Sequence, residues 1–459
     1  MYNIDFNNPV KVHFMGIGGI SMSGLALILR QRGFSVQGSD RSRSEITDML
    51  EDAGISIKYV QEAENITPDI DCIVYTAAIH RDNPEFAAAE ASGIPMLTRA
   101  ELLGQIMSHY RDSIAVSGTH GKTTTTSMIS VILMEAGKDP TVTLGGVLDE
   151  IGGNIRMGTS ESFVAEACEY TNSFLCLSPR IGLILNVDMD HVDFFKDTDD
   201  YRNSFRDFAR KIPEDGLLVI NGDIEDIDYF TDGVRCKVVT YGEGPDNDYR
   251  ASDITYDEKV HATYQLLIKG VPSGSFTLNV PGRHNVINSL AALAAADFLG
   301  VDRASEAAGL LRFGGTERRF EYKGSFNGVT VIDDYAHHPT EIEATLTTAK
   351  MAAKGKMWCV FQPHTYTRTK AFLKEFADAL SIADTIVLTH IYAAREQNTV
   401  GVSAGDICNI LCEKGREAYY IPEFEDVENF FKEKCSPGDM LITVGAGNVV
   451  EIGEHLVQK

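Results

Sequence analysis

The chain lacks the usual features of secreted, membrane and nucleic-acid-binding proteins. Its 459 residues include only eight cysteines, scattered without a C-x-x-C pair, which favours reduced thiols over a disulfide framework. No apolar run reaches the roughly 18 residues that a membrane span needs, and the start has no charged leader. Lys and Arg number 41 against 66 Asp and Glu, a net charge of −25, which excludes a broad phosphate-neutralising surface. We therefore expect a soluble cytoplasmic protein, a monomer or weak homo-oligomer, that binds no nucleic acid and enters no membrane.

What is present is the composition of a large folded protein. Hydrophobic residues make up 44% and charged residues 23%, as in ordinary globular proteins. Apolar strand-like runs that lead through a turn into a helical pattern open at residues 10–19, 113–121 and 328–338. Strands that alternate with helical stretches predict parallel sheets built from β-α-β units. The sequence thus predicts an α/β protein.

The length exceeds what one core supports, so three domains are predicted, near residues 1–110, 111–320 and 321–459. The first and last are expected to be Rossmann-like. The middle one is expected to resemble the α/β domain of phosphate-loop ATPases. Residues 243–282 read as short strands separated by turns, which predicts a small antiparallel layer in the middle domain.

The first glycine loop is "GIGGISMSGLA", which follows the first strand-like run. Gly16, Gly18 and Gly19 would let backbone amides at a helix start approach a pyrophosphate. Asp40 follows at the distance suited to a ribose hydroxyl. The G-x-G-G spacing differs from the dinucleotide fingerprint, so a nucleotide site of some kind and a plain strand-to-helix turn both stay open.

The second glycine loop is "GTHGKTTTT", residues 118–126, between two apolar runs. The full Walker pattern would place a glycine at Val116, which this chain does not have. Gly118 and Gly121 still permit a nest of amides, Lys122 suits the β and γ phosphates, and Thr123 offers a hydroxyl to magnesium. The alternative is a glycine turn before a helix capped by threonine; we favour an ATP site.

Acidic residues and a histidine end two strand-like runs that follow the second loop. Glu166 ends an apolar run where an unpaired carboxylate would be costly to bury. His191 follows another run among Asp188, Asp190 and Asp193, and alone it could be a hydrogen-bonded structural residue. Together with Thr123 these side chains favour two magnesium ions, which prefer oxygen ligands.

Together, the motifs "GTHGKTTT", the strand-end Glu166, "NVDMDHVD", "HNVINSLAAL", "RRFEYKG" and "DDYAHHPTE" resemble the Mur ligases, ATP-dependent enzymes that form amide bonds in bacterial cell-wall synthesis. The resemblance runs through all three expected domains. "DDYAHHPTE" and "FQPHTYTRT" are typical of the branch that joins L-alanine to UDP-N-acetylmuramate. Phe205 supports that branch, because several other Mur ligases have a carbamylated lysine there. The chain departs from the family in "EACEYTNSF", which replaces the commoner "EADESD".

The resemblance implies a role for each matching residue. ATP would be bound by Gly118, Thr119, His120, Gly121, Lys122, Thr123, Thr124, Asn288, Arg319 and Asp334. Magnesium would be held by Thr123, Glu166 and His191. The UDP-sugar would lie against Gly16, Gly18, Gly19, Asp40 and Asn154. The amino acid would lie among Tyr335, His337, His364 and Arg368. Lys122, Glu166, His191 and Arg319 would be catalytic.

The implied reaction begins when the lactyl carboxylate of the sugar attacks the γ-phosphate of ATP. The amine of L-alanine then displaces phosphate from the acyl phosphate, and ADP and phosphate are released. Three alternatives remain at this point: a family member that recycles a murein tripeptide, an NAD-dependent oxidoreductase built on the first loop, and a nucleotide-binding module without catalysis. The oxidoreductase leaves the second loop, Glu166 and His191 without a purpose.

Overall fold

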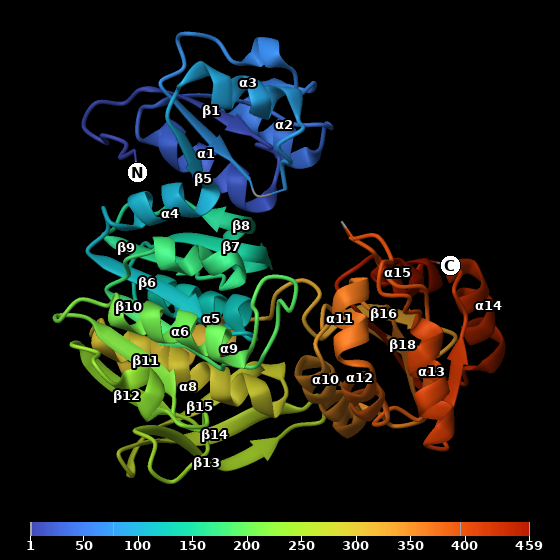
Figure 1. The fold of residues 1–459 in the computed structure, drawn as a ribbon. Coiled ribbons are helices and arrows are strands. Elements are labelled where there is room, and N and C mark those ends of the chain that lie inside the picture. Colours follow the sequence, from blue (N-terminus) through green and yellow to red (C-terminus); the bar gives the residue numbers. More distant parts are fainter. Residues whose placement is uncertain (1, 77, 395, 459) are drawn as a thin grey trace.

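The computed structural model describes residues 2–76, 78–394 and 396–458. The chain folds into three sheets with their helices, which Figure 1 shows as a blue unit above, a cyan to yellow unit below it and an orange to red unit beside it. Within the described ranges, no helix has the length and apolar character to span a bilayer. This architecture confirms the predicted α/β class.

The N-terminal sheet has five parallel strands in the order β3-β2-β1-β4-β5. Its strands are β1 (Lys11–Met15), β2 (Ser35–Ser39), β3 (Ser56–Lys58), β4 (Cys72–Tyr75) and β5 (Met96–Thr98). Its helices are α1 (Ile20–Gln31), α2 (Glu45–Asp52), α3 (Pro84–Ser92) and α4 (Arg99–Met107). The strand order reverses at β1, so a crevice opens beyond its carboxyl end. The first glycine loop begins there.

The middle sheet has ten strands in the order β15-β14-β13-β12-β11-β10-β6-β9-β7-β8. They are β6 (Asp112–Ser117), β7 (Thr141–Leu148), β8 (Gly153–Arg156), β9 (Ser162–Glu166), β10 (Ile181–Ile184), β11 (Leu217–Asn221), β12 (Lys237–Tyr241), β13 (Tyr249–Tyr256), β14 (His261–Ile268) and β15 (Val271–Pro281). Its helices are α5 (Lys122–Glu135), α6 (Thr198–Arg210), α7 (Asp228–Thr231), α8 (Arg283–Phe298) and α9 (Arg303–Arg312). Strands β13 to β15 pair antiparallel, which confirms the predicted antiparallel layer.

The C-terminal sheet has six strands in the order β16-β17-β21-β18-β19-β20, with only β16 antiparallel to its neighbour. They are β16 (Glu321–Phe326), β17 (Val329–Asp334), β18 (Met357–Phe361), β19 (Thr385–Leu388), β20 (Glu417–Tyr420) and β21 (Met440–Val444). Its helices are α10 (Pro339–Ala352), α11 (Tyr366–Ala371), α12 (Leu373–Leu380), α13 (Ala404–Glu413), α14 (Phe424–Lys434) and α15 (Val450–Val457). Trp358, the one tryptophan of the sequence, lies buried on β18 and donates to Asp439 Oδ2 at 2.9 Å.

The three units do not share their cores equally. One hydrophobic cluster runs from Phe14 and Ile106 of the N-terminal unit to Phe163 and Phe174 of the middle unit. The buried clusters of the C-terminal unit contain only residues from Phe326 onward. Apolar burial therefore joins the first two units, whereas polar contacts have a larger part in holding the third.

Candidate active site

The second glycine loop lies between strand β6 and helix α5, in a shape that requires glycine. Gly118 has φ +140°, and a Cβ added there would lie 2.9 Å from Leu185 Cβ. Gly121 has φ +81°, and its added Cβ would lie 2.8 Å from Asn288 Oδ1. Such φ values are strained for other residues. The predicted ATP residue Asn288, from helix α8, thus lies directly against the loop.

The ammonium group of Lys122 lies inside this loop. Its Nζ donates to the carbonyls of Gly118 at 2.5 Å and Thr119 at 3.0 Å, and to both carboxylate oxygens of Glu169 at 2.9 and 3.2 Å. Burial by itself would lower the pKa of Lys122, but the Glu169 carboxylate outweighs it and the pKa is raised. The lysine is therefore held charged where phosphates would bind.

Glu169 was not among the predicted site residues. Burial would raise the pKa of this buried carboxyl, but Lys122 and His191 outweigh that effect and lower it. A second acid three residues after Glu166 in the sequence was the available signal. The sequence could not show that this acid reaches the lysine.

Two of the three predicted magnesium ligands, Thr123 and Glu166, lie beside two glycines of strand β7. Glu166 Oε1 accepts from Gly145 N at 2.5 Å, and a Cβ added to Gly145 would lie 3.2 Å from both Glu166 oxygens. A Cβ added to Gly146 would lie 3.4 Å from Thr123 Cγ2. The bare backbone therefore leaves space beside the Glu166 carboxylate and the Thr123 side chain, and carboxylate and hydroxyl oxygens are donors that magnesium prefers.

His191 lies on the other side of this region, in a backbone conformation with φ +51°. Its Nε2 is 3.5 Å from Glu169 Oε1, and the ring of Tyr170 lies 4.6 Å from its own. Among the described residues, no three His, Cys, Asp or Glu side chains form a metal-type cluster by themselves. A metal here would therefore depend on Thr123 and on oxygens of the substrates.

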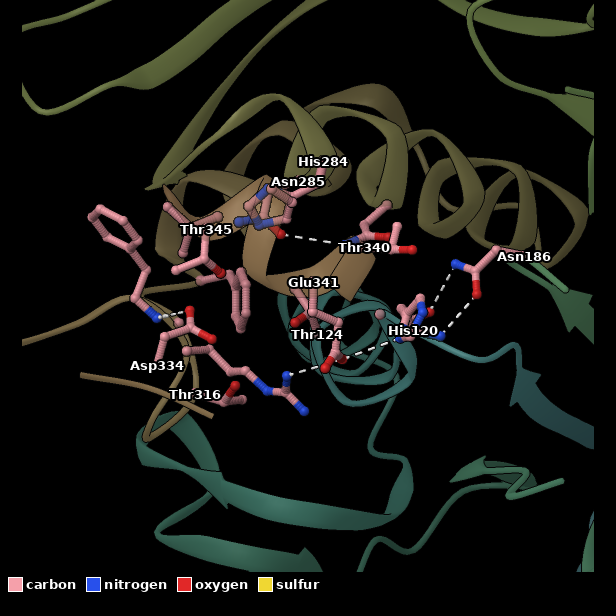
Figure 2. Close-up of a pocket in the computed structure, with 18 of the residues that line it drawn as sticks. His120, Thr124, Asn186, His284, Asn285, Thr316, Asp334, Thr340, Glu341 and Thr345 are labelled. Carbon is pink, nitrogen blue, oxygen red and sulfur yellow. Dashed lines mark hydrogen bonds and ion pairs between the residues drawn. The ribbon is translucent and has the colours of Figure 1, made fainter. Parts of the chain in front are cut away.

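A cavity of about 230 Å³ opens beside the loop, between the middle and C-terminal units (Figure 2). The predicted ATP residues His120, Gly121, Thr124, Asn288, Arg319 and Asp334 line it. His284, Asn285, Phe313 and Glu341 also line it and were not among the predicted site residues. The structure thus brings together residues that lie more than 200 positions apart in the sequence.

Asp334 and the two adjacent arginines have different surroundings. Asp334 accepts from Phe320 N at 2.9 Å and Ala336 N at 2.8 Å, and burial raises its pKa to about 6. Arg318 donates to Asp333 and to the carbonyls of Gly445 and Gly447, within the C-terminal unit. Arg319 instead faces the cavity, with its Nη1 3.7 Å from Glu341 Oε1. Only the second arginine of the pair is available to a ligand in this cavity.

The predicted amino-acid residues form a row of rings that ends at an arginine. The ring centroids of Tyr335 and His337 are 5.5 Å apart, and those of His337 and His364 are 5.8 Å apart. Arg368 Nη1 lies 3.1 Å from His364 Nδ1. Burial lowers the pKa of both histidines to about 4. The row is therefore uncharged near neutral pH except for the arginine.

Arg368 also joins the C-terminal unit to the middle unit. Its Nε and Nη2 donate to Asp190 at 2.9 to 3.1 Å, and both side chains are buried. A cavity of about 90 Å³ lies beside this pair, lined from the two units by Tyr170, Asp190, His191, Val192, Asp193, His364, Thr365, Thr367, Arg368 and Glu396. Tyr335 and His337 lie outside that lining.

The first glycine loop lies at the junction of the N-terminal and middle units. Gly18 N donates to Asp40 Oδ2 at 2.8 Å, so the predicted ribose acid holds the loop itself. Asn154 of strand β8 donates to the Ile20 carbonyl at 2.9 Å, directly after Gly19. The five predicted UDP-sugar residues therefore lie together, although they come from two units.

The comparisons with known proteins agree along the whole chain. Family models match residues 11–111 (Mur ligase family, catalytic domain), 116–296 (Mur ligase middle domain) and 318–447 (Mur ligase, glutamate ligase domain). The UDP-N-acetylmuramate–L-alanine ligase of Lachnospira eligens is 58% identical over 459 residues, 100% of both chains. The chain belongs to the Mur ligase family.

Two solved Mur ligase structures have the same fold. The UDP-N-acetylmuramate-alanine ligase MurC of Thermotoga maritima is 32% identical, with a TM-score of 0.81 over 98% of each chain. A murein peptide ligase of Psychrobacter arcticus is 25% identical, with a TM-score of 0.71 over 98% of each chain. Membership in this ATP-dependent family removes the oxidoreductase and the non-catalytic module as interpretations.

Phe205, which the sequence resemblance matches to the carbamylated lysine of several Mur ligases, is part of the core here. Its ring packs on Phe174 at 5.2 Å and on Tyr201 at 5.2 Å, and it is fully buried. This Mur ligase therefore has no modified lysine at that position. Lys122 lies inside the phosphate loop, and Arg319 lines the cavity beside it.

Proposed function

We propose that this chain joins L-alanine to the lactyl carboxylate of UDP-N-acetylmuramate, with conversion of ATP to ADP and phosphate. The observation that carries the proposal is the 58% identity, over the full length of both chains, to a relative with that printed name. The arrangement of the site supports it. A phosphate loop, a magnesium-type donor set and a small cavity beside an arginine meet where the middle and C-terminal units come together.

The first step is attack of the sugar carboxylate on the γ-phosphate of ATP. Both groups are anionic, so the site must cancel charge as they approach. Lys122 supplies a cation from inside the loop, and Arg319 supplies a second one from the segment that leads into the C-terminal unit. Glu169 keeps Lys122 charged and directed at the loop when no phosphate is bound.

Magnesium fits the residues on the two sides of Gly145 and Gly146. We propose that Thr123, Glu166 and His191 hold magnesium together with oxygens of the substrates. Two magnesium ions would be bound in total. A bound magnesium ion would neutralise phosphate charge and stabilise the transferring phosphoryl group. Within the chain, Glu166 is already oriented by the Gly145 amide, and Tyr170 packs against the His191 ring.

The second step is attack of the amino group of L-alanine on the acyl phosphate, with phosphate as the leaving group. The amino acid has a carboxylate and an ammonium group, and Arg368 and Asp190 already form a pair of opposite charges beside the cavity of about 90 Å³. We propose that the carboxylate binds Arg368. The uncharged His364 would complete that side of the site, with His337 and Tyr335 behind it.

We further propose that the three sheet units are domains, divided near residues 110 and 320, and that turnover includes movement of the third. The separate core of the C-terminal unit supports this division. The substrates ATP and the UDP-sugar favour a cytoplasmic reaction in a bacterium. We propose a monomer or weak homo-oligomer.

The test is a phosphate-release assay in which each component is left out in turn. Phosphate should appear only when ATP, magnesium, UDP-N-acetylmuramate and L-alanine are all present, and mass spectrometry should find the alanyl product. L-Serine, glycine and the murein tripeptide are assayed in parallel. Faster release with the tripeptide than with L-alanine would reject the proposal in favour of a recycling ligase.

A further inference from the structure

Glu341 is a buried carboxylate beside the predicted ATP cavity to which no role has been assigned. It lies in the first turn of helix α10, and its side chain is 11% exposed. Its Oε2 accepts from the backbone amides of His337 at 3.1 Å and His338 at 3.4 Å. This capping arrangement fixes one oxygen of the carboxylate to the start of its own helix.

The other oxygen of Glu341 faces the middle unit. Its Oε1 is 3.3 Å from Nδ1 of His120 in the phosphate loop and 3.7 Å from Nη1 of Arg319 (Figure 2). Burial would raise the pKa of Glu341, but His337, His120 and Arg319 outweigh it and hold the pKa well below its usual range. One charged group therefore joins the helix start, the phosphate loop and Arg319, a predicted ATP residue.

These contacts orient His120 and Arg319 without using all of their donors. The Arg319 distance of 3.7 Å is an ion pair rather than a hydrogen bond. His120 Nε2 is buried, lies 3.5 Å from Asp188 Oδ2, and has no hydrogen-bond partner among the described residues. Its ring centroid lies 4.6 Å from that of His338, with the two rings tilted by 39°. Both side chains thus keep polar atoms free for a ligand in the cavity that they line.

We propose that Glu341 is a positioning residue of the ligase reaction, which holds His120 and Arg319 in the orientation that receives the ATP phosphates. Glu341 belongs to the C-terminal unit and His120 to the middle unit, so this alignment exists only when the two units are packed together. ATP would then be correctly held only in the closed molecule. The inference rests on the proposed ligase function.

The test compares Glu341→Gln with Glu343→Gln, an exposed glutamate two residues further along the same helix. In Glu341→Gln the amide nitrogen must face either the backbone N–H groups of the helix start or the donors of His120 and Arg319. Loss of these charged contacts should lower kcat about ten- to a hundredfold. The KM for UDP-N-acetylmuramate should stay within about twofold, because the first loop is untouched. Glu343→Gln should behave as the wild type.

Two further measurements separate positioning from a fold defect. A non-hydrolysable ATP analogue should raise the melting temperature of the wild type and of Glu343→Gln, and should raise that of Glu341→Gln much less. The double variant His120→Gln/Glu341→Gln should lose little more activity than either single variant, because the two side chains act as one unit.

The proposal is overturned if Glu341→Gln keeps kcat within about twofold of the wild type, or if the two losses multiply independently. It is also overturned if activity falls only together with a lowered melting temperature, while the stabilisation by the ATP analogue stays intact. If the wild type itself fails to form ADP with L-alanine, the proposed function fails. In that case the rise in melting temperature caused by the ATP analogue still tests whether Glu341 positions the ATP site.

Discussion

The two glycine loops use the same strand-turn-helix geometry but carry opposite charges inside. In the first loop a protein carboxylate, Asp40, accepts from the Gly18 amide. In the second loop a protein ammonium, Lys122, donates to the carbonyls of Gly118 and Thr119. A group of backbone amides whose centre is occupied by a carboxylate presents little positive potential to a ligand. A lysine inside the loop adds positive potential. Glycine spacing alone therefore does not decide which loop handles a triphosphate.

The strongest test of this contrast is Lys122→Ala. It should lower ADP formation by about a thousandfold or more, because the main cation of the phosphate loop is gone. UDP-sugar binding, measured by calorimetry, should change little. The double variant Lys122→Ala/Glu169→Gln is the control, since it removes the buried charge that the single variant leaves unpaired. Normal ATP turnover in either variant would end the phosphate-loop assignment.

One glycine of each loop, Gly118 and Gly19, should also respond differently to an added methyl group. Gly118→Ala places a Cβ 2.9 Å from Leu185 at φ +140°, which should cost about 1 to 3 kcal/mol of unfolding free energy and most of the activity. Gly19→Ala has φ −64° and a nearest neighbour at 3.4 Å, so it should stay within about 0.5 kcal/mol. Urea unfolding of the two variants measures both. Equal losses would contradict the contrast.

Asp40→Asn tests the first loop in the opposite direction. The neutral side chain accepts more weakly from Gly18, so the KM for the UDP-sugar should rise about tenfold. The KM for ATP should stay unchanged, because the second loop is intact. Steady-state kinetics with each substrate varied in turn separates the two effects. A larger change in the KM for ATP would show that the loops do not divide the substrates as proposed.

The smallest expected effect is the loss of unfolding free energy at lower pH that arises from two histidines near the second loop. His337 and His364 have folded pKa values of about 4 against an ordinary 6.5, so between these values the unfolded chain binds more protons. Their contribution to stability is complete above the ordinary value and declines as the pH falls. From about pH 7.5 to 6 each should account for under about 1 kcal/mol. Melting curves of the wild type and His364→Gln should diverge less at the lower pH.

The sequence predicted the fold class well because its signals are local. Strand-like runs followed by glycine turns marked the start of each sheet, and turn-rich residues 243–282 marked the antiparallel strands β13 to β15. What it could not predict is how the units share their cores. The continuous cluster from Phe14 to Phe174 depends on packing between distant segments, which hydrophobic periodicity does not encode.

The candidate site, too, was predicted in part from the sequence. The motifs identified residues that lie along a cavity or a loop, such as His120, Asn288 and Arg319. They did not identify the carboxylates that hold those residues in place. Glu169 and Glu341 act through partners 47 and 221 positions away, and such pairs appear only once the chain is folded.

Trp358 gives the molecule an optical property of its own. It is the single tryptophan, it lies in the core of the C-terminal unit, and the amine of Lys356 lies 4.2 Å from the centre of its ring. Fluorescence excited at the long-wavelength end of protein absorption, where tryptophan absorbs and tyrosine does not, will therefore come from the C-terminal unit alone. Compared with circular dichroism, which averages over all three sheets, this emission can report when the third unit melts separately from the other two. The unlabelled protein thus contains a fluorescent probe for its C-terminal unit.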